Sequence, residues 1–161
     1  MDKKDLWLLE DWRSVLPSGL RTGLRLRFDQ SVDDEVRGAC LRFAAWLRKR
    51  YVFPVRVPVY IKASDRIQAM DGDFVVGSFF EPDCYDQEPY IRLAAGDYAE
   101  LSENRGRDDA LASILSSFAH ELTHYYQWIN ASSLSDAGRE RQASAYARRI
   151  LNEYAETCDH P

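Results

Sequence analysis

The sequence has few cysteines, which does not fit an extracellular disulfide-rich protein. Its three cysteines, Cys40, Cys84 and Cys158, are odd in number and widely spaced, and no two of them form a C-x-x-C pair. This pattern favours reduced thiols and a cytoplasmic protein.

The chain also lacks a long apolar run and an excess of positive charge. No stretch approaches the roughly 18 to 20 apolar residues of a membrane helix. The N-terminal segment has acidic residues within its short apolar run, unlike a signal peptide. The formal net charge of -5 opposes a chain-wide basic surface. We therefore expect no membrane partner and no nucleic-acid partner.

The 161 residues suffice for one domain with a substantial core, and no repeat or linker divides them. We expect an N-terminal extension of one helix and one strand (1–30), a core (31–156) and a tail (157–161). Periodicity predicts helices over 5–16, 31–50, 109–129 and 136–156, strands over 24–28, 55–61, 74–81 and 89–94, and a loop or frayed helix over 96–109. This order predicts an α+β fold with a small mixed or antiparallel sheet.

Three residues refine these elements. Ser31, with Asp34 three residues later, predicts the start of the second helix as a variant of the capping box. Cys40 lies on the apolar face of that helix, so it is expected to fill the core. Pro58 has no amide hydrogen, and it predicts that strand 55–61 lies at a sheet edge or carries a bulge.

The stretch SFAHELTHYYQW (117–128) contains the pattern His-Glu-x-x-His. Residues four apart on a helix stand one turn apart, so the imidazoles of His120 and His124 can bind one ion. Glu121 is turned off the metal axis, where it can hydrogen-bond a water on zinc without binding zinc itself. The two histidines lie nearly opposite the apolar stripe formed by Leu111, Ile114, Leu115, Phe118 and Leu122. We therefore expect this helix to form the floor of a cleft.

A catalytic zinc takes three protein ligands and a water, and the next helix offers two further candidates. Glu140 shares its face with Ala143, Ser144 and Ala147, small residues that let this helix approach a neighbour closely. Asp136 lies one turn earlier on the same face and is also a good N-cap. Glu140 is the favoured third ligand and Asp136 its rival, although a first-turn acid can also simply complement the helix dipole.

HELTHYYQW followed by a helix beginning ERQASAYA resembles the gluzincin metallopeptidases. The second stretch is similar to the glutamate-helix signature of the ImmA/IrrE-like peptidases, with matches at Glu140, Gln142, Ala143, Tyr146 and Ala147. The short connection between the motifs also resembles the minimal scaffolds called minigluzincins. The resemblance covers 107–156, and over 53–94 it extends only to the order of the elements.

This resemblance implies a zincin-like fold with a backing helix, a small sheet whose edge strand binds substrate, an active-site helix and a glutamate helix. It implies a metallopeptidase with one zinc per chain, bound by His120, His124 and Glu140, and Glu121 as the general base acting on a protein or peptide substrate. Where these peptidases usually have Asp or Asn, this chain has Ser144. In them a carboxylate or amide at this position holds a histidine ligand by its free N–H, so the resemblance does not extend to this supporting contact.

Some roles stay open in the sequence. A stabiliser of the tetrahedral oxyanion is expected, and the candidates are Tyr125, Tyr126, Tyr146 and Arg141. The segment VVGSFFEPD (75–83) is the candidate for the substrate-binding edge, with packing into the core as the alternative for its phenylalanines. The tail, with Cys158, Asp159 and His160, could fold back onto the open zinc position and keep an enzyme latent, or it could fray.

Three other functions compete with a general peptidase. The first is a peptidase of the same chemistry that cleaves one narrow target, such as a repressor-cleaving regulator or a DNA-associated protease. The net negative charge of the chain argues against association with DNA. The second is a non-catalytic zinc-binding or interaction domain with a regulatory role, in which Glu121 would have no use as a base. The third is a chance motif in a packed helical hairpin, with no metal. The substrate and the oligomeric state are not given by the sequence, and the same ligands suit several ions.

Overall fold

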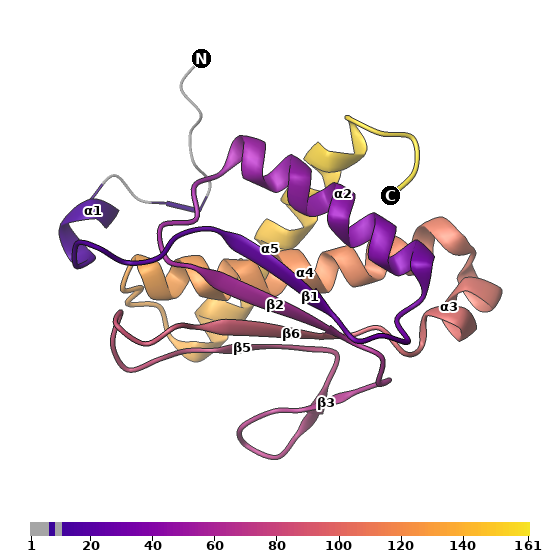
Figure 1. Cartoon of the computed structure of the whole chain (residues 1–161), viewed down its shortest axis with the longest axis horizontal. Coiled ribbons are helices and arrows are strands. Elements are labelled where there is room, and N and C mark those ends of the chain that lie inside the picture. Colours follow the sequence, from indigo (N-terminus) through magenta and orange to yellow (C-terminus); the bar gives the residue numbers. More distant parts are fainter. Residues whose placement is uncertain (1–6, 9–10) are drawn as a thin grey trace.

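The computed structural model describes residues 7, 8 and 11–161 (Figure 1). Its elements are α1 (Trp12–Val15), β1 (Leu24–Phe28), α2 (Asp34–Arg50), β2 (Val57–Lys62), β3 (Ile67–Gln68), β4 (Phe74–Val75), β5 (Gly77–Phe80), β6 (Tyr90–Ala94), α3 (Tyr98–Arg105), α4 (Arg107–Ile129) and α5 (Asp136–Ala155). The prediction of an α+β fold with a small mixed sheet is confirmed.

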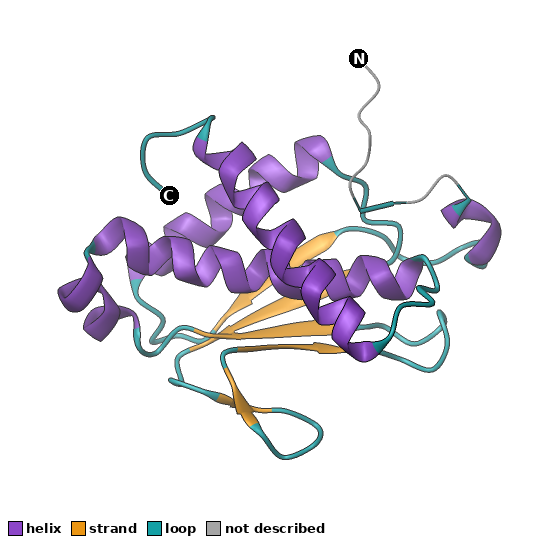
Figure 2. Ribbon diagram, turned by 180° about the vertical axis from the view of Figure 1, so that it is seen from behind, coloured by secondary structure: helices purple, strands orange, loops and turns teal. Residues whose placement is uncertain are grey.

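The main sheet has the strand order β1-β2-β6-β5. The first three strands are parallel, and β5 runs antiparallel to β6 at the edge. Val57, Val59 and Ile61 on β2 are fully buried, whereas Tyr60 between them is exposed. The sheet therefore has one covered face, and helices α2 and α4 lie over it (Figures 1 and 2).

Strand β2 is an interior strand, so the prediction that Pro58 marks an edge or a bulge is wrong. The amide of Val57 donates to Gly23 of the chain leading into β1. Alternation along the strand turns the neighbouring position, Pro58, toward the β6 side. Pairing with β6 begins only at Val59. The missing amide hydrogen of Pro58 therefore lies one residue before the hydrogen bonds between β2 and β6 begin, so the proline removes none of them.

The single strand predicted over 74–81 is divided in two by a bend at Val76. Strand β4 pairs with β3 in a separate two-stranded hairpin, while β5 joins the main sheet. The hairpin projects away from the helical layer (Figure 1). The segment 75–83 does supply the edge strand, as its pattern predicts.

Two helices begin one or more residues away from their predicted caps. The N-cap of α2 is Asp33, whose side chain accepts a hydrogen bond from the amide of Glu35, so the prediction of a cap at Ser31 is wrong. The N-cap of α5 is Ser135, whose hydroxyl accepts a hydrogen bond from the amide of Gly138. Cys40 on α2 is fully buried, as predicted, and burial raises the pKa of its thiol to about 12.

Of the helix predicted over 5–16, only α1 (Trp12–Val15) is helical among the described residues, and residues 7 and 8 are not. The remainder of that prediction, over 5–6 and 9–10, lies outside the described residues. Trp7 is buried against α4, where its indole N–H donates to Thr123 Oγ1 at 3.0 Å and its ring stacks on Tyr126. In the described ranges, no helix is both long and apolar enough to cross a bilayer.

Candidate metal centre

Helix α4 places the two histidines of the motif on the side away from its core stripe. Leu111, Leu115, Phe118 and Leu122 are fully buried and Ile114 is nearly so. The side chains of His120 and His124 keep 25% and 13% of their surface exposed, so an ion could reach them from solvent. The helical prediction for this face is confirmed.

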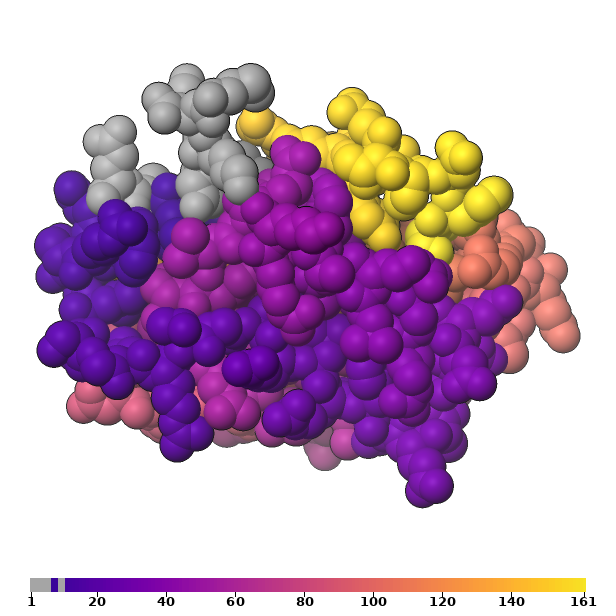
Figure 3. All heavy atoms as spheres, turned by 45° about the horizontal axis from the view of Figure 1, so that its top comes forward, coloured from indigo at the N-terminus to yellow at the C-terminus, as the bar shows by residue number. Residues whose placement is uncertain are grey.

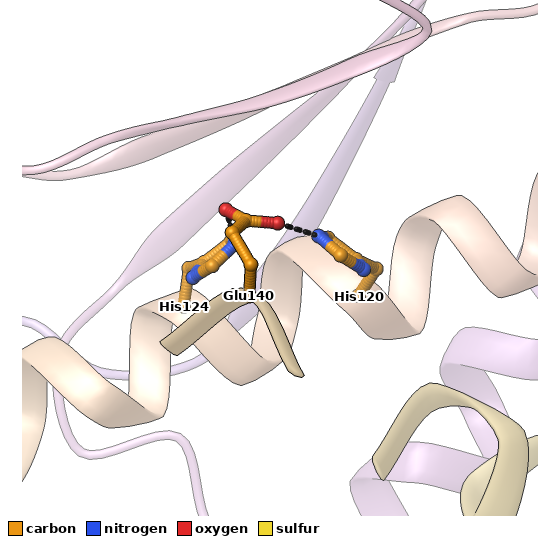
Figure 4. A group of neighbouring side chains, drawn as sticks. All are labelled: His120, His124 and Glu140. Carbon is orange, nitrogen blue, oxygen red and sulfur yellow. Dashed lines mark hydrogen bonds and ion pairs between the residues drawn. The ribbon is translucent and has the colours of Figure 1, made fainter. Parts of the chain in front are cut away.

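Helix α5 brings Glu140 against both imidazoles (Figure 4). Glu140 Oε2 lies 3.1 Å from His120 Nε2, and Glu140 Oε1 lies 3.0 Å from His124 Nε2. The candidate ligand atoms of the three residues all lie within 4.8 Å of one another. Donors on a tetrahedral zinc are about 3.4 Å apart, so a small adjustment of these side chains would admit an ion.

Asp136, the rival third ligand, lines the same cavity but is not part of this group of potential ligands. It is the first residue of α5 rather than its cap. The structure therefore brings together His120, His124 and Glu140, the set that we favour from the sequence, and a metal could be held there.

The three residues open onto a cavity of about 710 Å³. Its other walls are the hairpin and edge-strand segment 75–79, the serines Ser116 and Ser117 of α4, and the side chains of Glu81 and Arg139. A strand edge, a potential metal site and charged groups thus share one hollow. Within it, Phe79 is only half-exposed, because its ring also packs against Tyr125 of the core.

Glu121 lies in the same cavity but keeps only 7% of its surface exposed. Burial, and then the negative charge of Glu140, raises the pKa of its carboxyl to about 8. A cation among the neighbouring ligands would act in the opposite direction, because a positive charge favours the carboxylate. A carboxyl with these properties is suited to accept and release a proton near neutral pH.

His120 is less firmly held than its partner. Burial and the nearby charge of His124 lower the pKa of its imidazole, and Glu140 partly offsets this. In the part of the chain that the structure describes, Glu140 is the only hydrogen-bond partner of this ring. Ser144 on α5 is exposed and makes no hydrogen bond to this ring.

His124, in contrast, is held by a residue that the sequence pattern did not single out. Its Nδ1 lies 2.8 Å from Oε1 of Gln127, one turn further along α4. Gln127 is 3% exposed and also bonds to Arg139 and Gln142 of α5. Arg139 in turn pairs with Glu81 at 3.1 Å. The i to i+3 spacing of His124 and Gln127 was the available signal, but many helical pairs share it.

None of the four candidates for oxyanion stabilisation lines the cavity. The hydroxyl of Tyr125 is buried on the core side and bonds to the backbone of Val55, and that of Tyr126 bonds to Val52. Tyr146 accepts a hydrogen bond from Gln142, and Arg141 is exposed. Arg139 is the cationic side chain that does line the cavity.

The C-terminal tail folds back, but not onto the metal group. His160 Nδ1 lies 2.7 Å from Asp108 Oδ2 at the start of α4, and Arg42 of α2 donates to the carbonyl of Pro161. The tail therefore lies beside α2 on the surface (Figure 3). Neither Cys158 nor His160 belongs to the group of potential ligands.

Comparisons of the chain with protein-family models, with curated proteins and with solved structures found no match. Evidence for a function comes from the residues of this site.

Proposed function

We propose that this chain is a zinc-dependent metallopeptidase built on a zincin-like domain. The observation that carries the proposal is the position of Glu121. A buried carboxyl lies directly beside a group of two imidazoles and a carboxylate, inside a cavity that borders a free sheet edge. This combination suits hydrolysis better than it suits a purely structural metal site.

The ligand set fits a catalytic zinc. Structural zinc sites use four protein ligands, whereas catalytic sites use three and leave one position open. In the described ranges, the group contains three residues and no fourth. Two imidazoles and one carboxylate also form a typical zinc ligand set, although other divalent ions accept it.

A zinc ion held by His120, His124 and Glu140 would polarise the scissile carbonyl and make a water more acidic. Glu121 is the residue that would take the proton from the attacking water. It would then return this proton to the nitrogen of the leaving amine. Its position supports this role, because the carboxyl is buried in the same cavity as the three proposed ligands and beside the strand edge.

The substrate would be an extended peptide aligned along β5. Among the residues that the structure describes, this strand pairs only with β6, so its other edge has backbone groups available to a peptide. Gly77 and Ser78 of β5 line the cavity beside Glu121. A scissile bond held along this strand would therefore lie close to the proposed base.

The substitution Glu121→Gln tests the proposal. It removes the base and preserves the size of the side chain, so we expect turnover of a quenched fluorescent peptide library to fall by about 10² to 10⁴. Zinc content should stay unchanged. The matched control is Glu103→Gln, an exposed glutamate of α3 outside the cavity, which should keep full activity.

Two results would contradict the proposal. Equal peptide cleavage by the wild type and Glu121→Gln would assign the activity to another source. Zinc-loaded wild type that cleaves no peptide, with unfolded proteins included as substrates, would favour the non-catalytic zinc-binding domain instead.

A further inference from the structure

We infer that Gln127 is a positioning residue that forces His124 to present Nε2, and not Nδ1, to a metal. The inference concerns the proposed zinc site, so it rests on the proposed function for its purpose. The hydrogen bonds that carry it are present in the metal-free chain.

The amide of Gln127 has only one possible orientation. One end of this amide lies 3.0 Å from the carbonyl oxygen of Arg139, which can only accept, so this end must be the nitrogen. The other end lies 3.3 Å from Nε of Arg139, which can only donate, so this end must be the oxygen. Arg139 therefore fixes both ends of the amide, which removes the usual ambiguity in placing its oxygen and nitrogen.

The orientation of the amide decides the tautomer of His124. Its Nδ1 lies 2.8 Å from the amide oxygen of Gln127, which has no hydrogen to give. Nδ1 must therefore carry the proton, and in the neutral ring Nε2 is left with a free lone pair. That lone pair is directed at Glu140 Oε1, 3.0 Å away. Two such acceptor atoms repel each other unless a proton or a metal ion lies between them.

Gln142 completes the arrangement from α5. The amide nitrogen of Gln127 donates its second hydrogen to Gln142 Oε1 at 3.0 Å. The oxygen of Gln127 accepts two hydrogen bonds and its nitrogen donates two, so the buried amide has its full set of partners. A fully bonded buried amide is costly to rotate, because any rotation leaves polar atoms unpaired.

The two histidines of the proposed site are held differently. Ser144 of α5, where the peptidases that the sequence resembles have Asp or Asn, makes no hydrogen bond to His120. Here the holding group is on α4 itself and serves the second histidine. His124 is thus set in place before a metal binds, whereas His120 is oriented by Glu140 alone within the described residues.

The first test is the protonation of His124 in the metal-free protein, measured by two-bond ¹H–¹⁵N correlation NMR at neutral pH. We expect Nδ1 to carry the proton in the wild type. In Gln127→Met, which has no acceptor, we expect the proton to move toward Nε2, where Glu140 can accept it. A wild-type His124 with bare Nδ1 would overturn the inference, whether or not the protein binds zinc.

The second test is zinc affinity, measured by competition with a chromophoric chelator. Gln127→Met should bind zinc about 10- to 100-fold more weakly, the usual cost of losing a group that orients a ligand. Gln127→Glu keeps the acceptor for His124 and for Arg139 but sets its second oxygen against the carbonyl of Arg139, so it should weaken zinc binding clearly less than Gln127→Met does. Gln87→Met, at an exposed glutamine in the loop between β5 and β6 outside the cavity, is the control and should bind zinc as the wild type does.

The pattern across the variants separates the possible outcomes. Equal weakening in Gln127→Met and Gln127→Glu would overturn the inference, because the acceptor would then be irrelevant. Unchanged affinity in both variants would overturn it too. If Gln127→Met does not fold, the NMR result on the wild type and the affinity of Gln127→Glu decide. If the wild type binds no zinc, the proposed function fails, and the protonation of Nδ1 still tests the role of Gln127.

Discussion

Gly77 on β5 and Glu121 on α4 lie so close together that a β-carbon at residue 77 would be 3.0 Å from Oε1 of Glu121. A side chain at residue 77 would therefore press on the carboxyl of the proposed base. The backbone of Gly77 is extended and any residue could adopt it, so the glycine is required by this contact and not by its conformation.

The substitution Gly77→Ala should consequently displace the carboxyl of Glu121. We expect the peptidase kcat/KM to fall at least about 10-fold, because small misplacements of a catalytic group are costly. Zinc content should be unaffected, since the three proposed ligands do not touch residue 77. Gly38→Ala in α2 is the control. Its β-carbon meets only the flexible end of Arg42, and alanine is about 0.5–1 kcal/mol better than glycine in a helix. Unchanged kcat/KM in Gly77→Ala would show that this contact does not position the base.

The substitution Tyr125→Phe separates a packing role from a catalytic one. The hydroxyl of Tyr125 donates to the carbonyl of Val55 at 2.5 Å and accepts from the amide of Val55 at 3.1 Å. Its loss leaves both buried backbone groups unpaired, so we expect the free energy of unfolding to fall by about 1–3 kcal/mol. Chemical denaturation measures this, and kcat at a temperature where both proteins are folded should not change. A selective loss of kcat would contradict the structural assignment.

The carboxylate of Asp29 joins the end of β1 to the turn after β2. It accepts hydrogen bonds from the amide of Ala63 and from the ammonium of Lys62, and these contacts lower its pKa below the ordinary 3.8. The unfolded chain therefore binds a proton at a higher pH than the folded chain does. The resulting stabilisation is complete above pH 3.8 and is lost as the pH falls through the lowered pKa.

The substitution Asp29→Asn should therefore destabilise the protein at pH 7 by about 1 kcal/mol or less, because the pair is partly exposed. The difference from the wild type should shrink when urea unfolding is repeated at about pH 3. Asp86→Asn, an exposed aspartate in the loop between β5 and β6, is the control and should show no such trend. A destabilisation that grows toward acid pH would contradict the assignment.

Helix α4 shows what periodicity can predict. Its apolar stripe and its histidines fall on the expected faces, because a long helix repeats one pattern over many turns. Glu140 was also identifiable from its small neighbours, since Ala143 and Ala147 are buried in the contact with α4. The group of residues that could hold a metal thus follows from two helical patterns and their facing sides.

Other features could not be predicted, because several residues compete for one cap or because an element is too short or too polar to show a periodic pattern. Ser31, Asp33 and Asp34 are all possible caps within four residues, and the backbone selects Asp33. Helix α3 was expected as a loop or a frayed helix, and it buries only Tyr98, so it has almost no apolar period to detect. Strands β3 and β4 have two residues each, too few for alternation to be visible.

The bonds that hold His124 could not have been predicted, because they depend on how two helices meet. Gln127 and Gln142 are ordinary polar residues in the sequence. They become partners only when α4 and α5 pack side by side. Tertiary hydrogen bonds of this kind carry no local periodic signal.

The measurement that tests the central claim most directly is zinc per chain, determined by elemental analysis after purification without added metal or chelator. We expect about one zinc in the wild type and near none in His124→Ala. His160→Ala should keep about one zinc, because this third histidine pairs with Asp108 and does not belong to the group that could hold a metal. Near-zero zinc in the wild type, with no uptake when zinc is supplied, would contradict the account and leave a helical hairpin with two surface histidines.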